Sequence, residues 1–234
     1  MTAAAEGGST AVAIVLAAGS GSRMGGDRPK AFLAVDGRAL LTIAAEAACA
    51  SPRISSVVVA VPPGWEGRAR ALVPSGSATV VAGGDTRQES VRLALGAVPA
   101  DVAIVAVHDA ARALATPSLF DAVLAAVTGT LAGAVPVIPV PDTVKRVEGE
   151  LVAETVPREH LALAQTPQAF LRGPLIEAHR RAAAEGRVFT DDASLVEWAG
   201  GAVATVPGDP ENFKVTTGGD LDRAEFVLRR RRDG

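Results

Sequence analysis

A glycine-rich loop with two cations carries the clearest chemistry in this sequence. Residues 17–30 have the sequence Ala-Ala-Gly-Ser-Gly-Ser-Arg-Met-Gly-Gly-Asp-Arg-Pro-Lys and follow an apolar segment at residues 12–16. Glycine loops bind phosphate through backbone N–H groups. Here Arg23 and Lys30 add two full positive charges beside Gly19 and Gly21. The loop therefore predicts a site for a highly charged triphosphate rather than for a diphosphate bridge.

Two better-known glycine loops do not fit this spacing. A Walker A loop requires Gly-Lys-Ser/Thr at its end, and no lysine follows the glycines in that frame. A dinucleotide fingerprint requires Gly-x-Gly-x-x-Gly opening directly into a helix. The spacing here is Gly19-x-Gly21-x-x-x-Gly25, and Pro29 interrupts the loop. A plain strand-to-helix turn is the remaining alternative, and the embedded cations argue against it.

An aspartate follows the most hydrophobic predicted strand. Residues 102–107 are apolar, and His108-Asp109-Ala110-Ala111-Arg112 come next. A carboxylate in this position can hold Mg²⁺ through one oxygen while phosphates and water complete the octahedron. Asp109 is therefore a candidate metal ligand, and a turn-capping role is the alternative. His108 has no histidine or cysteine at metal-ligand spacing, which favours a structural role.

A second glycine turn, Gly83-Gly84-Asp85, enters a predicted helix that contains Ser90. Paired glycines let the backbone approach a flat base closely, and backbone and serine groups can read that base by hydrogen bonding. Thr86 is also a possible N-cap.

Three further polar clusters interrupt apolar segments, and no Ser-His-Asp set supports acyl chemistry. Thr190 is a possible helix cap. Lys214 stands in a predicted strand, where a cation needs an anionic partner or solvent. The clusters are Thr166-Pro167-Gln168, Thr190-Asp191-Asp192 and Asn212-Phe213-Lys214-Val215-Thr216.

The elements that must position these residues alternate between strand and helix. Continuous apolar strands indicate a sheet covered on both faces, and the alternation predicts an α/β fold with a Rossmann-like, mostly parallel twisted sheet flanked by helices. Ligands of such sheets bind beyond the carboxyl ends of the strands. Strands are expected at residues 12–16, 57–61, 79–82, 102–107, 134–140, 202–206 and 213–216, and helices at 39–50, 65–72, 87–98, 117–127, 174–185, 191–199 and 220–232.

The alternation breaks at residues 141–165, where a polar β-hairpin is expected. A two-stranded hairpin is marginal alone in water, so this arm is expected to pack on something else, such as a second subunit. We expect one domain over residues 1–234, with a flexible N-terminus at 1–10 and an inserted arm at 141–165.

Composition excludes several classes of protein. Aromatic residues make up 3% of the 234 residues and the net charge is −3, which argues against nucleic-acid binding. Cys49 is the single cysteine, so no internal disulfide forms. We expect no signal peptide and no membrane span, and hence a cytoplasmic enzyme. The arginines at 229–232 are expected to complement a helix dipole and aid solubility.

Taken in order, these motifs resemble the 2-C-methyl-D-erythritol 4-phosphate cytidylyltransferase family of the non-mevalonate isoprenoid pathway. The resemblance runs from residue 12 to residue 228, and Ala113 departs from it where the family commonly has proline. The first motif alone is shared widely among nucleotidyltransferases. The series is Leu16-Ala17-Ala18-Gly19-x-Gly21-x-Arg23-Met24, Pro29-Lys30, Gly83-Gly84-x-x-Arg87-x-x-Ser90, His108-Asp109-Ala110-Ala111-Arg112, Asp142-Thr143-Val144-Lys145, Thr166-Pro167-Gln168, Thr190-Asp191 and Lys214-Val215-Thr216.

The resemblance implies a Mg²⁺-dependent reaction of CTP with methylerythritol phosphate that gives CDP-methylerythritol and pyrophosphate. It implies that Arg23, Lys30 and Lys214 are catalytic, and that Asp109 binds the metal. It further implies that Arg158, on the arm, reaches the substrate phosphate in the neighbouring active site of a homodimer. The implied nucleotide-binding residues are Ala17, Ala18, Gly19, Gly21, Gly84, Asp85, Ser90 and Asp109, and the implied substrate-binding residues are Arg112, Thr143, Arg158, Thr166 and Thr190.

Some alternatives stay open at this point. Glu211, near Lys214, is a weaker candidate for a second metal ligand. A cytidylyltransferase for another polyol phosphate, such as ribitol 5-phosphate, shares the triphosphate loop. An NAD-dependent oxidoreductase fits the glycine spacing less well. A non-catalytic nucleotide-binding module would not need all four charges of Arg23, Lys30, Asp109 and Lys214.

Overall fold

The computed structural model describes residues 11–19 and 28–233. The predicted flexible N-terminus at residues 1–10 lies outside these residues, and so do Gly21 and Arg23.

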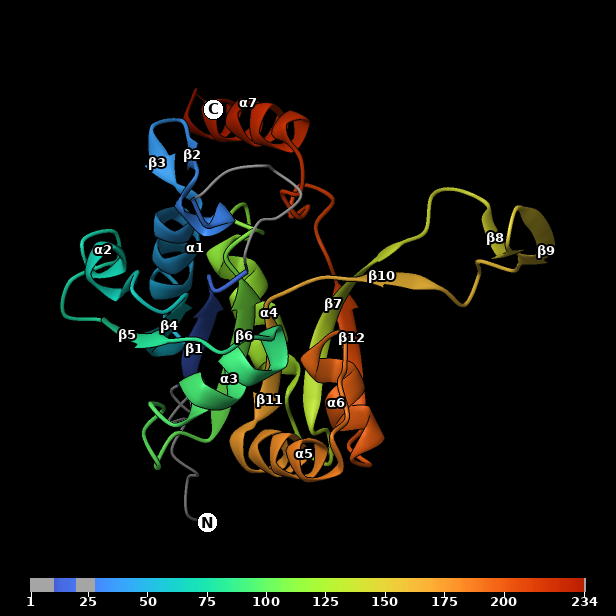
Figure 1. Cartoon of the computed structure of the whole chain (residues 1–234), viewed down its shortest axis with the longest axis horizontal. Coiled ribbons are helices and arrows are strands. Elements are labelled where there is room, and N and C mark those ends of the chain that lie inside the picture. Colours follow the sequence, from blue (N-terminus) through green and yellow to red (C-terminus); the bar gives the residue numbers. More distant parts are fainter. Residues whose placement is uncertain (1–10, 20–27, 234) are drawn as a thin grey trace, which may run out of the picture.

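In the described residues, an eight-stranded sheet forms the centre of the fold (Figure 1). Four neighbouring strands, in the order β6-β1-β4-β5, pair in parallel, and β12 pairs in parallel with β7. The strand β11 inserts antiparallel between β6 and β7, so the expected mostly parallel sheet is confirmed. The strands are β1 (Ala11–Leu16), β4 (Ile54–Val61), β5 (Ala78–Ala82), β6 (Ile104–Asp109), β7 (Gly133–Pro139), β10 (Ala162–Ala164), β11 (Gln168–Leu171) and β12 (Val203–Pro207).

The continuous apolar sequence of β1 follows from burial on both faces of the sheet. Every residue of this strand is buried. Ala13 and Val15 join one hydrophobic cluster, whereas Ile14 and Leu16 join the cluster on the opposite face. The period of two along a strand divides the side chains in this way.

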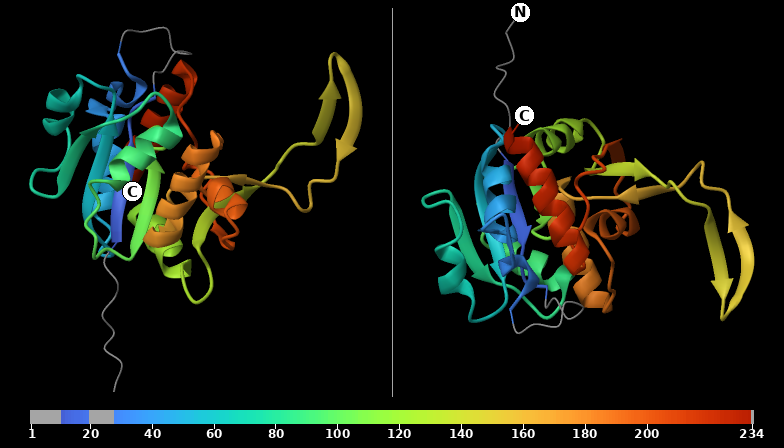
Figure 2. Two further views of the ribbon diagram at one scale, coloured as in Figure 1. Left: turned by 60° about the horizontal axis from the view of Figure 1, so that its bottom comes forward. Right: turned by 90° about the horizontal axis from the view of Figure 1, so that it is seen from above.

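Helices cover both faces of the sheet (Figure 2). On one face pack α1 (Leu40–Cys49), α2 (Glu66–Arg70) and α4 (Pro117–Ala126). On the other face pack α3 (Arg87–Leu95), α5 (Arg172–Glu185) and α6 (Asp192–Trp198). None of the described helices has the length and apolar character needed to cross a membrane.

The arginines near the C-terminus fasten the last helix to the rest of the fold. Helix α7 (Gly218–Asp233) packs over a third hydrophobic cluster with Ala224 and Val227. The Glu211 carboxylate pairs with Arg230 and Arg231, and Arg231 also donates to the Leu114 carbonyl at 2.8 Å. For the arginines at 229–232 we expected only a role in the helix dipole and in solubility, and the sequence did not indicate these specific ion pairs. Both oxygens of Glu211 are engaged by these arginines, which argues against the second metal ligand considered from the sequence.

The predicted hairpin is present and projects from the body (Figures 1 and 2). Strands β8 (Val144–Glu148) and β9 (Leu151–Val156) pair antiparallel. Leu151 is 76% exposed, and Val147 and Val152 are also exposed. The arm thus displays apolar side chains to solvent within one chain.

Some local elements differ from the sequence prediction. Residues 213–216 do not form a strand, although the Val215 N–H donates to the Ala111 carbonyl at 2.8 Å. The strands β10 and β11, and the small hairpin of β2 (Ala34–Val35) and β3 (Arg38–Ala39), were not predicted. These strands have only two to four residues, too few to show a period in the sequence.

We predict that Gly133→Ala destabilises the fold. A Cβ at residue 133 would stand 2.3 Å from Cδ1 of the buried Phe170 and 2.8 Å from the Ala169 carbonyl oxygen, so the sheet must shift. The expected loss in the free energy of unfolding is about 1–3 kcal/mol, measured by urea denaturation. Gly67→Ala is the control, because nothing lies within 4 Å of its added Cβ. Equal denaturation midpoints for the two variants would contradict the prediction.

Candidate active site

The candidate site forms where β1 and β6 end side by side. Leu16 is the register partner of Asp109. The Ala110 N–H donates to the Leu16 carbonyl at 3.0 Å, and the Ala17 N–H donates to the Ala60 carbonyl at 2.8 Å. Two parallel pairings therefore place the start of the glycine loop next to Asp109, as predicted from the strand-end rule.

Asp109 lies between two cations. The Arg87 Nε donates to Oδ1 at 3.1 Å, and the Lys214 Nζ donates to Oδ2 at 2.6 Å. Burial by itself raises the pKa of a carboxyl group, but the charges of Arg87 and Lys214 outweigh it and hold the pKa of Asp109 well below its usual range. Asp109 is therefore ionised at neutral pH. Asp109 is also the anionic partner that we expected Lys214 to need.

Arg87 extends this pairing into the protein interior. Its Nη1 donates to Asp192 Oδ2 at 2.7 Å, and the His179 Nε2 lies 3.2 Å from Asp192 Oδ1. Burial opposes the charge of Arg87, yet the carboxylates of Asp192 and Asp109 outweigh it and raise the pKa of Arg87 above its usual range. One guanidinium thus joins α3, the end of β6 and the start of α6.

Thr166 fixes the backbone of Asp109 from the other side. Its Oγ1 accepts from the Asp109 N–H at 3.0 Å and lies 3.0 Å from the His108 Nδ1. Burial lowers the pKa of His108 to about 4, so this imidazole is neutral at pH 7. His108 is buried among core groups, as the structural interpretation expected. The hydroxyl of Thr166 is engaged within the protein, and the residue is 5% exposed.

The second glycine turn lies against the start of the first loop. The Gly84 N–H donates to Ser90 Oγ at 3.1 Å, and that hydroxyl donates to the Thr86 carbonyl at 2.9 Å. A Cβ at Gly83 would stand 2.7 Å from the Cβ of Ala18. The structure therefore brings Ala18, Gly84 and Ser90 together. Ser90 is buried and shapes this turn, while Asp85 beside it is exposed.

Arg112 holds the segment that carries Lys214. Its guanidinium donates to the Asn212 carbonyl at 2.9 Å and to the Ala164 carbonyl at 3.2 Å. Burial lowers the pKa of Arg112 relative to its usual value. Asn212 Nδ2 in turn donates to the Thr166 carbonyl at 2.9 Å. Arg112 and Thr166 therefore belong to one network with Lys214.

The first loop and the segment before α6 hold further predicted site residues. Lys30 begins the short 3₁₀ helix Lys30–Phe32, and Gly19 is exposed. The possible cap at Thr190 is wrong: Asp191 caps α6 by accepting from the Ser194 N–H at 3.0 Å, and Thr190 is exposed. The possible cap at Thr86 is confirmed by its bond from the Glu89 N–H at 3.1 Å.

Two predicted residues lie at the base of the arm. Thr143 is exposed, and the Arg158 guanidinium donates to the Pro141 carbonyl. Within the described chain, neither residue contacts the cluster around Asp109. The structure of one chain therefore does not bring either residue to the cluster around Asp109, and their roles stay predictions.

Sequence reasoning assigned no role to Arg87, Asp192 or His179. Arg87 and Asp192 stand inside motifs that had been singled out. The available signal for Asp192 was an acidic residue at the start of the helix predicted at residues 191–199. His179 stands in helix α5 with no motif around it. Gln168 was also missed: it donates to Asp191 Oδ2 at 2.8 Å and accepts from the Ala193 N–H at 3.1 Å.

Comparisons with known proteins agree with this geometry. The family model for IspD, 2-C-methyl-D-erythritol 4-phosphate cytidylyltransferase, matches residues 11–230. The protein of that name from Frankia casuarinae is 47% identical over 219 residues, which cover 93% of this chain and 81% of the relative. The one from Streptomyces coelicolor is 45% identical, with 94% and 85% covered. The crystal structure of the Thermus thermophilus enzyme has 40% identity and a TM-score of 0.78, covering 92% of this chain and 98% of that one.

The fold is a mostly parallel α/β sheet, and its strand ends carry a glycine loop, one ionised carboxylate and several cations. This combination defines a nucleotidyltransferase. The class follows from the fold, from the Asp109 cluster and from the names of these relatives. Within that class, the chain belongs to the 2-C-methyl-D-erythritol 4-phosphate cytidylyltransferase family.

We predict that Asp192→Asn destabilises the protein in a pH-dependent way. Burial raises the pKa of this carboxyl group, but the charge of Arg87 and the hydrogen bond from His179 outweigh it, and the net pKa is lowered. A lowered folded-state pKa adds stability above the unfolded-state value of about 4, and this stability is lost as the pH falls through the folded-state pKa. The expected loss at pH 7 is about 1–3 kcal/mol.

Urea denaturation between pH 3 and pH 7 tests this. The gap between wild type and Asp192→Asn should be constant above about pH 5 and narrow as the pH falls below about 4. The exposed Asp222→Asn is the control and should follow the wild type. A gap that widens toward low pH would contradict the assigned ion pair.

Proposed function

We propose that this protein transfers the cytidylyl group of CTP to 2-C-methyl-D-erythritol 4-phosphate, giving CDP-methylerythritol and pyrophosphate. The observation that carries the proposal is the Arg87–Asp109–Lys214 cluster beside the start of the glycine loop, in a chain whose family match spans residues 11–230. The whole reaction is assigned to one domain, with residues 141–165 as an inserted arm.

In this reaction the protein mainly has to neutralise the charge of the phosphates and position the two substrates. The substrate phosphate is already an anionic nucleophile, so it needs no general base. Its oxygen attacks the α-phosphorus of CTP in line and pyrophosphate leaves, which brings two anions together. Lys30, Lys214 and Arg23 are proposed to offset that repulsion. Lys214 is held near the reaction centre by Asp109, at 2.6 Å.

The nucleotide is proposed to bind at the two glycine turns. Ala17, Ala18, Gly19 and Gly21 would face one side of it, and Gly84, Asp85 and Ser90 the other; Asp109 would lie near the ribose. The contact between Gly83 and Ala18 supports this arrangement, because it brings the two turns together. Ser90 would act by holding the Gly84 backbone in place, since its hydroxyl is bonded to that turn.

Asp109 is suited to a divalent cation, which members of this enzyme class generally require. It is an ionised carboxylate at a strand end, and each of its oxygens has a lone pair beyond the one that Arg87 or Lys214 uses. In the described residues no group of three or more acidic, histidine or cysteine side chains could hold a metal alone. Such a site suits Mg²⁺, which takes one or two carboxylates plus substrate phosphates and water. When bound, the ion would neutralise charge on the phosphates.

The substrate side is proposed to include Arg112, Thr143, Thr166, Thr190 and Lys214. The hydrogen bonds described above favour an indirect role for two of them. Thr166 would position Asp109, and Arg112 would position the segment around Lys214. Thr190 is exposed and has its hydroxyl available for a ligand.

The arm is proposed to complete the site of a second copy of this chain. Its exposed Val147, Leu151 and Val152 are suited to an interface. Arg158, at its base, would then contact the substrate phosphate bound by the partner. The proposed assembly is a homodimer.

Pyrophosphate release tests the proposed function. CTP and Mg²⁺ are supplied with either methylerythritol phosphate or ribitol 5-phosphate. Release with methylerythritol phosphate alone supports the proposal. Release with ribitol phosphate alone keeps the transfer chemistry but replaces the acceptor. No release with either acceptor and any of the four nucleoside triphosphates would overturn it.

We predict that Lys30→Ala lowers kcat by about 10²–10³-fold, equivalent to about 3–4 kcal/mol of transition-state stabilisation. The fold should persist, because Lys30 is itself partly exposed at the start of a short 3₁₀ helix whose buried residues are Ala31 and Phe32. Steady-state kinetics measure the effect, with Lys30→Arg as the charge-preserving comparison. Near-normal turnover of Lys30→Ala would remove its assigned role.

A subunit-mixing experiment tests whether Arg158 acts on the partner's site. Arg158→Ala should raise the KM for methylerythritol phosphate, and Lys214→Ala should lower kcat. In a mixture of the two variants, random assortment makes about half of the dimers mixed. Each mixed dimer has one site with both native residues, so about a quarter of wild-type activity should return. No recovery in mixtures shown by sedimentation to be dimeric would place Arg158 in its own subunit's site.

A further inference from the structure

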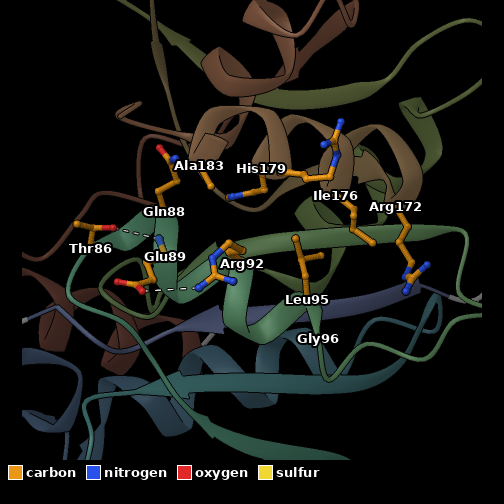
Figure 3. Close-up of a pocket in the computed structure, with 11 residues that line it drawn as sticks. Thr86, Gln88, Glu89, Arg92, Leu95, Gly96, Arg172, Ile176, His179 and Ala183 are labelled. Atoms are coloured by element: carbon orange, nitrogen blue, oxygen red, sulfur yellow. Dashed lines mark hydrogen bonds and ion pairs between the residues drawn. The ribbon is translucent and has the colours of Figure 1, made fainter. Parts of the chain in front are cut away.

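A pocket of about 690 Å³ lies between α3 and α5, apart from the Asp109 cluster (Figure 3). None of the proposed catalytic or ligand-binding residues lines it. Its walls combine apolar side chains with charged ones. In Figure 3, Leu95 and Ile176 lie between Arg92 and Arg172. The pocket therefore has an apolar middle with cations toward its ends.

The charges of the pocket lining are unbalanced. Three arginines line it, against one glutamate. Arg180 is neutralised by Glu177, at 2.7 Å, and Arg92 pairs loosely with Glu89, at 3.7 Å. Arg172 has no ion pair or side-chain hydrogen bond in the described part of the chain, and its buried Nε has no partner. Arg172 is therefore a guanidinium of this lining without a carboxylate partner in the described residues, and such a group is suited to an anion.

We propose that this pocket is an effector site for a small organic phosphate with a short aliphatic body. The phosphate would bind Arg172, and the aliphatic part would cover Leu95 and Ile176. The volume lies within the 300–1,000 Å³ range common for small-molecule sites. A phosphate suits a guanidinium because it accepts two parallel N–H bonds.

The pocket is connected to the active site through helix α3. Leu95 and Arg92 of this helix face the pocket, while Arg87 binds Asp109 and Ser90 holds the Gly84 turn. His179, a pocket residue that is 2% exposed, contacts Asp192, and Asp192 binds Arg87 at 2.7 Å. Occupancy of the pocket would therefore act on both the Asp109 carboxylate and the nucleotide turn.

Calorimetry on the full chain with n-hexyl phosphate tests the binding site. The expected Kd is on the order of 1 mM or tighter, from ligand size. Arg172→Gln should weaken binding about tenfold or more, because it removes the phosphate partner. The exposed Arg70→Gln on α2 is the matched control and should bind as the wild type does. Inorganic phosphate and ethyl phosphate should bind more weakly, since they lack the aliphatic body.

The active site also takes phosphates, so Lys214→Gln separates the two sites. Binding of hexyl phosphate that persists in Lys214→Gln and is lost in Arg172→Gln supports the proposal. Loss in Lys214→Gln with no change in Arg172→Gln would overturn it, and so would the absence of binding at about 10 mM ligand, well above the expected Kd. These measurements do not depend on the proposed function.

The effector role, which does rest on the proposed function, is tested by kinetics. Hexyl phosphate should change the KM for CTP by about fivefold or more in the wild type, the lower end of typical allosteric couplings. Arg172→Gln should have normal basal activity and no response. Binding at the pocket with unchanged kcat and KM would overturn the effector role. A protein without any activity would instead contradict the proposed function.

Discussion

The guanidinium of Arg87 is the interaction on which the site depends. It binds Asp109 at 3.1 Å and Asp192 at 2.7 Å, so one side chain links the end of β6 to the starts of α3 and α6. Two largely buried carboxylates without this cation would each face a large desolvation cost. Their pairing with Arg87 keeps both ionised and fixes the position of the Asp109 carboxylate at the end of β6. The anionic centre of a site otherwise rich in cations is thereby set by a residue outside the loop.

Backbone groups and charged side chains divide the remaining tasks at the strand ends. The two glycine turns approach so closely that a methyl group at Gly83 would overlap Ala18. In the proposed nucleotide site, small residues there would leave backbone N–H and C=O groups to face the ligand, so a chain with 3% aromatic residues would not need aromatic stacking. The cations act differently: Lys214 is ordered by its ion pair, and Arg112 orders the segment around it.

Sequence reasoning predicted the parts of this architecture that are set locally. Continuous apolar runs predicted the parallel strands. The glycine loop and Asp109 were predicted to lie together because the carboxyl ends of parallel strands meet at the same edge of the sheet. The antiparallel β11 was missed because its four residues carry no detectable period. The pairing of Arg87 with Asp192 spans 105 residues, and that of His179 with Asp192 needs the packing of α5 on α6. No pattern within one segment contains such information, although Arg87 and Asp192 stood inside the motifs themselves.

The long sequence separations within the charged cluster also set the order in which its ion pairs can form while the chain is being synthesised. Lys214 lies 105 residues after Asp109, and Asp192 lies 105 residues after Arg87. Chains emerge from the ribosome with the N-terminal side first, so β1, β4 and β6 are available for pairing long before either late partner. During that interval Arg87 and Asp109 can pair with each other, but Asp192 and Lys214 are still missing. The charged centre is consequently among the last parts of the molecule to close, and a nascent chain can assemble much of its sheet while the site remains incomplete.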